Sequence, residues 1–199
     1  EITLTTALSQ ERHGVALLYE MLKARFKAGA PDLGGPDRRV QLVGTRAKNI
    51  DLLWRGTDGY EGSSAPSTLY IRAEHAEFEN CKAVSVRFGD GTQFERTHFA
   101  KKTDFYHAEF GKDVRFDLSI FGDQTDFSTA TFDDNASFTR AVFGVEANFN
   151  GARFGPKALF RHARFGNIAD FIQADFAADA DFRGCHFGAQ AIFKNASFA

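Results

Sequence analysis

Residues 99–127 read FAKKTDFYHAEFGKDVRFDLSIFGDQTDF, and Phe recurs in them at alternating gaps of six and five residues. The same spacing extends from Phe88 to Phe198. Self-similarity at a fixed period is typical of stacked repeats, in which each repeat packs only against its neighbours. We therefore interpret this stretch as a repeat array before weighing any local motif.

The two gaps add up to a period of 11 residues, which also occurs in right-handed helical coiled coils. A helical interpretation fails, however. At about 100° per residue, steps of five and six residues place successive Phe side chains roughly 140° and 240° apart, which makes no single stripe. Gly, Asp, Asn and Thr fill the gaps, and they suit turns better than helix interiors.

A β-strand explains the spacing better, because side chains two residues apart lie on the same face of a strand. A small side chain stands two residues before each Phe, as Ala108 precedes Phe110 and Thr125 precedes Phe127. We expect both members of each pair to point into a core. The residue between them is mostly polar, as is Asp126, and should face outward. Each unit of five or six residues is therefore predicted to be one short strand and a corner.

Glycine marks the corners of the longer units. It directly follows most of the Phe residues that open a six-residue gap, such as Phe110 and Phe121, and never follows a Phe that opens a five-residue gap. A residue that tolerates positive φ suits a bulge or a widened turn. We therefore predict positive φ at the glycine of every second corner.

The order of a small residue, a polar residue and a central Phe is plainest in ASFTRAVF (136–143), ANFNGARF (147–154) and ADFIQADF (169–176). It resembles the pentapeptide-repeat proteins. The resemblance covers roughly residues 68–199 and implies an all-β solenoid, a right-handed quadrilateral β-helix with four repeats per coil. One added residue in every second repeat lengthens the expected coil from 20 to about 22 residues.

The chain before these repeats is predicted to hold a cap and a degenerate first coil. Residues 1–39 would form an amphipathic α-helix from Ser9 to about Lys27, which covers the N-terminal end of the solenoid, and a linker. Residues 40–67 would form a degenerate coil and an inserted loop, and residues 68–199 the regular β-helix. The loop carries Trp54 and Tyr60, which are binding anchors if exposed, although a lone Trp beside a solenoid more often belongs to the core.

Motifs for chemistry are missing from the sequence. It has no phosphate-binding Gly loop, no HExxH, no GxSxG and no paired Cys motif. The His residues of the repeats fall at outward positions and form no convergent ligand set. Cys81 and Cys185 stand at the inward small position, nearly five coils apart, and are expected to be free thiols in a reducing compartment. We predict no enzyme activity, no catalytic residue, no cofactor and no metal.

The composition is that of an ordinary soluble chain. The 199 residues carry a formal net charge of −2, which is not basic enough to indicate direct nucleic-acid binding. No apolar run reaches the 18 or so residues that span a bilayer, and no secretory signal is visible. We expect a bacterial, cytoplasmic protein. Because the first residue is Glu and the last repeat stops in phase at Ala199, we also expect a trimmed segment.

Two functions of different class are compatible with this pattern. Solenoids offer long flat faces that suit macromolecular recognition, so the favoured function is a non-catalytic scaffold that binds another protein or a second copy of itself. The alternative comes from the resemblance, because some pentapeptide-repeat proteins mimic duplex DNA and inhibit or protect a type II topoisomerase such as gyrase. Such mimicry requires a one-sided acidic face.

A candidate acidic face follows from a coil of about 22 residues. Its outward column would hold side chains about 4.8 Å apart, and two further carboxylates would share the face. The column consists of Asp104, Asp126, Asn148 and Asp170, and the further pair is Asp123 and Glu146. Residues 71–199 nevertheless contain 18 acidic and 15 basic residues, a net charge of only −3. The mixed charge favours the scaffold.

Overall fold

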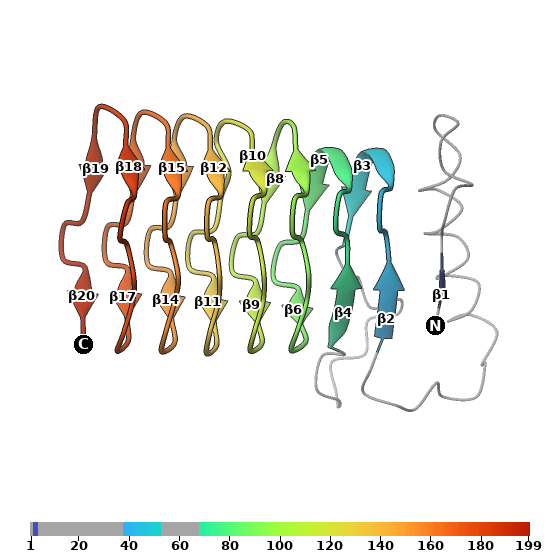
Figure 1. Cartoon of the computed structure of the whole chain (residues 1–199), viewed down its shortest axis with the longest axis horizontal. Coiled ribbons are helices and arrows are strands. Elements are labelled where there is room, and N and C mark those ends of the chain that lie inside the picture. Colours follow the sequence, from blue (N-terminus) through green and yellow to red (C-terminus); the bar gives the residue numbers. More distant parts are fainter. Residues whose placement is uncertain (1, 4–37, 53–67) are drawn as a thin grey trace, which may run out of the picture.

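The computed structural model describes residues 2–3, 38–52 and 68–199, and no helix occurs in these ranges. They form a solenoid of about six turns, whose coils stack in sequence order (Figure 1). The prediction of an all-β solenoid is thus confirmed. The predicted helix from Ser9, and the loop with Trp54 and Tyr60, lie outside the described residues. The handedness of the coil and the limits of the domains stay predictions.

The strands shorten along the chain. β1 (Ile2–Thr3) pairs with β2 (Arg38–Gln41), and β3 (Arg46–Asp51), β4 (Leu69–Arg72) and β5 (Glu77–Lys82) follow. The later strands have two residues each: β6 (Arg87–Phe88), β7 (His98–Phe99), β8 (Thr103–Asp104), β9 (Glu109–Phe110), β10 (Ile120–Phe121), β11 (Thr131–Phe132), β12 (Val142–Phe143), β13 (Ala147–Asn148), β14 (Arg153–Phe154), β15 (Arg164–Phe165), β16 (Ala169–Asp170), β17 (Asp175–Phe176), β18 (His186–Phe187), β19 (Ala191–Ile192) and β20 (Ser197–Phe198).

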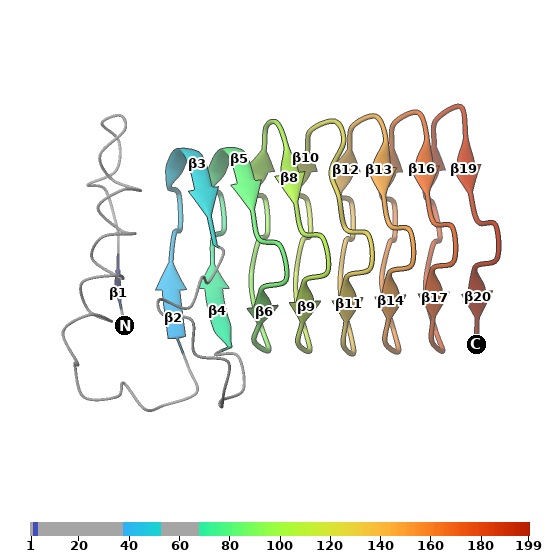
Figure 2. The ribbon, with the colours of Figure 1, turned by 180° about the vertical axis from the view of Figure 1, so that it is seen from behind.

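Strands of successive coils pair in parallel. Ile120 of β10 pairs with His98 of β7 and with Val142 of β12, an offset of 22 residues on each side. The pairs build sheets of nine, eight and three strands, which Figure 2 shows from behind. Isolated bridges such as Gln93 to Arg115 add a further ladder. Each regular coil therefore contributes to four parallel ladders, and the added residue lengthens the coil without removing one.

The first coil departs from this period. Val40 of β2 pairs with Ile71 of β4, 31 residues later, and Ala47 of β3 pairs with Phe78 of β5 at the same offset. Residues 53–67, which lie outside the described residues, fall within this longer interval of the sequence. The strands on either side of the interval pair in register.

Columns of Phe rings fill the solenoid. Phe99 stacks on Phe121 with ring centroids 4.9 Å apart, and Phe121 stacks on Phe143 at 4.7 Å, with the ring planes within 2° of parallel. Neighbouring columns meet edge to face, as Phe88 and Phe94 do at 83°. Both arrangements suit the aromatic quadrupole, and burying each ring stabilises the fold by about 2 kcal/mol.

The small residues two positions before each Phe from Phe88 to Phe176 lie in the same core, as predicted, whereas those of the last coil are partly buried or, at Ala191, exposed. Thr97 and Ser119, for example, are fully buried. Their hydroxyl groups donate to the carbonyl oxygens of Ala73 and Phe94 in the preceding coil. Inward polar atoms are therefore satisfied by the backbone, and they tie adjacent coils together.

Each corner from His107 to Gly184 contains one residue with positive φ, three residues before the next Phe. Most of these residues are not glycine. The conformation costs an ordinary residue about 1–2 kcal/mol. It also turns the corner amide toward the next coil, where the Leu118 nitrogen donates to the Thr139 carbonyl oxygen at 2.9 Å. The hydrogen bond between coils offsets part of the strain.

The prediction for the corner glycines was wrong. Gly122 and Gly144 are not among the residues with positive φ. A Cβ at Gly144 would lie 2.7 Å from the Asp123 amide nitrogen and from the Gly122 carbonyl carbon in the preceding coil. Glycine is required there because the coils approach closely, and positive φ falls on a later residue of the same corner.

Candidate interaction surface

The acidic column (Asp104, Asp126 and Asp170, with Asn148) lies on one ladder of the solenoid. Its members are connected by parallel bridges and by the pairing of β13 with β16. All four side chains are partly buried. Lys82 precedes the column on this ladder, and Ile192 follows it. The ladder therefore changes from basic through acidic to apolar along its length.

Each side chain of the acidic column stabilises the turn that follows it. Asp126 Oδ1 accepts hydrogen bonds from the backbone amide and the hydroxyl of Ser128, at 2.8 and 2.6 Å. Asp104, Asp170 and Asn148 each accept from the amide two residues on, at 3.1, 2.8 and 3.0 Å. Because an Asn serves as well as an Asp, the turn needs the oxygen acceptor and does not need the charge.

Asp123 and Glu146 lie in the corner before this ladder. Asp123 Oδ1 accepts from the Val145 amide in the next coil at 2.7 Å. Gln124 Nε2 donates to Glu146 Oε2 at 3.0 Å. Both acidic side chains are exposed. The structure thus divides the five acidic candidates into two sets with different neighbours.

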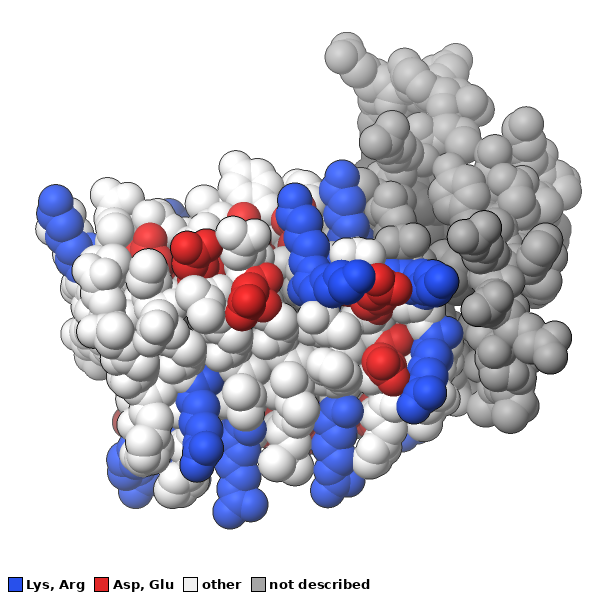
Figure 3. Space-filling view, turned by 90° about the horizontal axis from the view of Figure 1, so that it is seen from above, with Lys and Arg blue, Asp and Glu red and all other residues white. Residues whose placement is uncertain are grey.

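A surface that sequence reasoning missed lies on the adjoining face and on the two corners that flank it. Large apolar side chains are exposed there at Leu118 (41%), Ile120 (48%), Val142 (39%), Val145 (39%) and Ile168 (38%), and we name these five residues the exposed strip. Ile120 and Val142 are paired neighbours. Figure 3 views the solenoid from the side of the corners that follow β7, β10, β12 and β15, and shows uncharged surface between the charged side chains.

Two residues of the exposed strip also have strained backbone. Leu118 has a φ of 60°, and Ile168 has a φ of 64°. Positive φ is uncommon outside glycine and is an outlier for a β-branched residue. The same corner columns hold Arg140 and Gln124 at similar φ, of 58° and 57°. The fold therefore accepts polar side chains at these corners and does not require apolar ones.

Charged side chains border the exposed strip at both edges. Arg140 and Arg164 stand at one edge, and Asp123 and Glu146 stand at the other. All four are exposed, and each shares an outward column with a member of the strip. The apolar centre thus has basic side chains at Arg140 and Arg164 and acidic ones at Asp123 and Glu146, with the exposed Arg96 next to Leu118 in the preceding coil. This surface can bind one of opposite pattern.

The repeat pattern is recognisable in the sequence although the outward residues vary. A family model of pentapeptide repeats, with nine copies, matches residues 155–197. Residues 155–197 are therefore pentapeptide repeats. A comparison with curated proteins found no similar sequence. The matched residues belong to the coils in which Ala fills almost every small inward position, so the pentapeptide pattern is least altered there.

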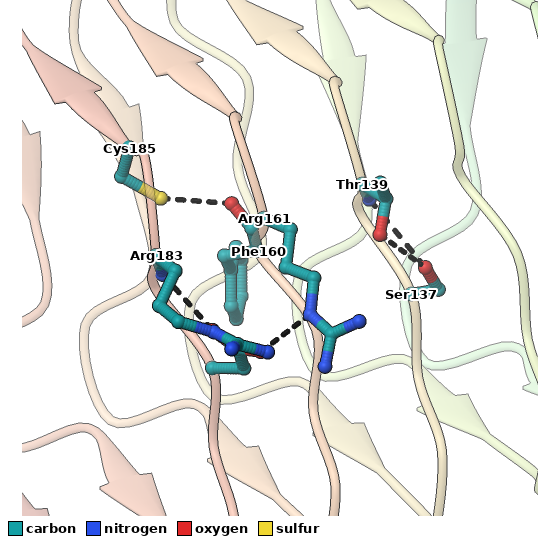
Figure 4. A network of polar contacts seen from close by, with 7 residues as sticks. Ser137, Thr139, Phe160, Arg161, Arg183 and Cys185 are labelled. Atoms are coloured by element: carbon teal, nitrogen blue, oxygen red, sulfur yellow. Dashed lines mark hydrogen bonds and ion pairs between the residues drawn. The ribbon is translucent and has the colours of Figure 1, made fainter.

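The last coils of the solenoid hold a polar network (Figure 4). Arg161 Nε donates to Asp181, and Arg183 Nη2 approaches the same carboxylate at 2.7 Å. The hydrogen bonds from Arg183, followed by those from Arg161, hold the pKa of Asp181 well below its usual range. Cys185 Sγ donates to the Phe160 carbonyl oxygen at 2.8 Å, and burial raises the pKa of this thiol to about 11.

Neither a metal-binding cluster nor a membrane-spanning helix is found in the part of the chain that the structure describes. Within residues 2–3, 38–52 and 68–199, no three His, Cys, Asp or Glu side chains group as metal ligands. No helix in those ranges has the length and apolarity that crossing a membrane requires. Cys81 and Cys185 form no disulfide, and Cys81 is buried.

Proposed function

We propose that the chain is a non-catalytic scaffold that binds another protein through the exposed strip. The observation that carries this proposal is the exposure of Leu118 and Ile168 at positive φ. At these two corners an apolar side chain is only partly buried and strains the backbone. Because such a side chain stabilises neither the core nor the turn, a contact with another molecule best explains its presence.

The neighbours of these two residues support the same function. Ile120 and Val142 lie side by side in the outward position, where most repeats place a polar residue. Apolar side chains next to one another bind a partner more strongly than scattered ones, because a continuous area leaves water on association. The flat face of a solenoid holds them in fixed register.

The charges at the edges define the partner. The edge with Arg140 and Arg164 favours acidic side chains, and the edge with Asp123 and Glu146 favours basic ones. We therefore propose a partner segment with an apolar stripe, acidic residues along one side and basic residues along the other. The partner is a second protein, or a second copy of this chain.

A photo-crosslinking experiment tests the proposal. A photoreactive amino acid replaces Ile120 in the exposed strip or, as a control, the exposed Arg153 on another face. We expect a protein partner to crosslink at position 120 and not at 153. Excess native chain should compete for it, and the Leu118→Asn/Ile168→Asn variant should not. Identical products at both positions, or equal competition by both chains, would contradict the proposal.

The DNA-mimic alternative is supported by one feature, the oxygens of the acidic column that the turns leave free. The negative electrostatic field of the column is weakened by Asn148 in its middle and by Lys82 and Ile192 at its ends. The test is an Asp104→Asn/Asp126→Asn/Asp170→Asn variant, which keeps every turn acceptor and removes three charges. A mimic would inhibit gyrase supercoiling in the native form and lose this effect in the variant, and a scaffold predicts no inhibition by either. We propose a cytoplasmic location in both cases.

A further inference from the structure

A hollow of about 290 Å³ lies beside β4, β6 and β9, on a corner that does not belong to the exposed strip. Gly89 and Gly111 line it, together with the ring of Tyr70. A Cβ at Gly89 would come within 2.3 Å of the Tyr70 Cε1 atom, so glycine gives the ring its place. The hollow therefore has one aromatic wall and a lining of backbone, from which side chains are absent at two positions.

The rest of the lining is negatively charged. Arg87 and Glu109 neutralise each other in an ion pair of 2.6 Å. Asp90 Oδ1 accepts from the Lys112 amide at 2.8 Å, and the Lys112 ammonium pairs with a carboxylate outside the hollow. Within the described ranges, neither Asp90 nor Asp133 takes part in an ion pair. The hollow thus combines an aromatic face with two carboxylates that form no direct ion pair in the described ranges and that share the attraction of the nearby Lys112 ammonium with Asp134.

We propose that this hollow binds the guanidinium group of an arginine side chain on a partner protein. A guanidinium is planar, stacks on an aromatic face, and presents its donors in a fork that matches carboxylates. Tyr70 supplies the face, and Asp90 and Asp133 supply the acceptors. A lysine ammonium would find the same charge without the stacking. The inference does not rest on the exposed strip.

The experiment uses the whole chain and small probes. Amide NMR shifts are followed while N-acetyl-arginine amide is added, with the neutral isostere N-acetyl-citrulline amide and the lysine analogue as comparisons. We expect the arginine probe to shift Gly89, Gly111 and Lys112, the citrulline probe to shift none of them, and the lysine probe to bind about two- to fivefold more weakly. Equal shifts with arginine and citrulline would overturn the proposal.

The chain offers a matched pair of variants. Asp90→Asn and Asp123→Asn remove the same charge and keep the same acceptor for an amide of the next coil, as Asn167 does naturally for Ala189. Asp90→Asn should weaken binding of the arginine probe about two- to fivefold, and Asp123→Asn should leave it unchanged. Equal weakening by both variants would mean general surface attraction and would refute the site.

Two further variants separate stacking from charge, and this site from the exposed strip. Tyr70→Leu should remove the preference for the arginine probe over the lysine probe. If the preference survives in that variant, the ring does not stack on the ligand and the assignment to arginine is wrong. Leu118→Asn/Ile168→Asn should not change probe binding, so the two proposals succeed or fail separately.

Discussion

The acidic column and the exposed strip occupy adjoining faces of the same coils, and they differ in what the fold gains from them. Every member of the acidic column accepts a hydrogen bond that closes its own turn. In the exposed strip, Leu118 and Ile168 hold positive φ and leave apolar area in water.

The comparison shows how a repeat protein can be searched for function. The acidic column attracts attention first, because charges repeat along it, yet its residues have a sufficient reason in the turns. The exposed strip has no such reason, so it is the stronger candidate. In a fold that dictates most positions, a residue that the fold does not need is informative.

The largest effect is expected where the coils approach most closely, at the glycine between Val142 and Val145. Gly144→Ala places a Cβ against backbone atoms of the preceding coil and should lower the free energy of unfolding by about 2 kcal/mol. Gly151→Asn is the control, because Gly151 has a φ of 65° and only a methyl group 3.6 Å away. Urea denaturation measures both, and an equal loss in the two variants would contradict close packing as the cause.

The next effect tests the turn role of the acidic column. Asp126→Ala removes the acceptor for the Ser128 amide and should cost about 1 kcal/mol. Asp126→Asn keeps the acceptor, as Asn148 does, and should stay within about 0.3 kcal/mol of the native chain. Thermal unfolding of the three proteins distinguishes the roles. If Asn were as harmful as Ala, the charge would matter and the column would need another explanation.

A substitution in the exposed strip should raise the free energy of unfolding, whereas Asp126→Ala lowers it. Ile168→Asn replaces a β-branched residue at positive φ by one that tolerates it and should raise the free energy of unfolding by about 0.5–1 kcal/mol. Gln124→Asn in the same column is the control and should change it by less. Urea midpoints measure both variants. A clear loss of stability in Ile168→Asn would show that the fold does need this side chain.

The smallest effect on stability is expected at low pH. Asp181 closes its turn as the acidic column does, through the Arg183 amide at 3.0 Å, but two arginines also hold its pKa below its usual range. The stability it contributes is present above its unfolded pKa of about 3.9 and is lost as pH falls through the folded value. Below about pH 4 the free energy of unfolding of the native chain should fall toward that of Asp181→Asn. The decrease should be less than about 1 kcal/mol. A difference that stays constant from pH 7 to 2 would contradict this account.

The sequence predicts the core well because one side chain decides each unit. Phe110 must stack on Phe88, so the spacing of Phe fixes the length of the coil and the register of the ladders. The need for glycine at position 144 could not be predicted in the same way, because the sequence of one repeat does not give the distance between coils. Positive φ at Ile168 is also unpredictable, because local preference favours Gly or Asn there.

The exposed strip was missed for a different reason. The outward position is mostly polar when it is averaged over all repeats, and this average conceals Ile120 and Val142. Reading each outward column in coil order would have placed these two residues side by side, given the 22-residue coil. The candidates Trp54 and Tyr60 lie outside the described residues and stay predictions.

The most direct test of the central claim measures stability and binding in one variant. Leu118→Asn/Ile168→Asn is compared with the native chain by urea denaturation, and by its affinity for the partner that crosslinks at position 120. The account predicts a variant at least as stable as the native chain that has lost most of its affinity. A less stable variant that still binds the partner would contradict it, because these side chains would then serve the fold.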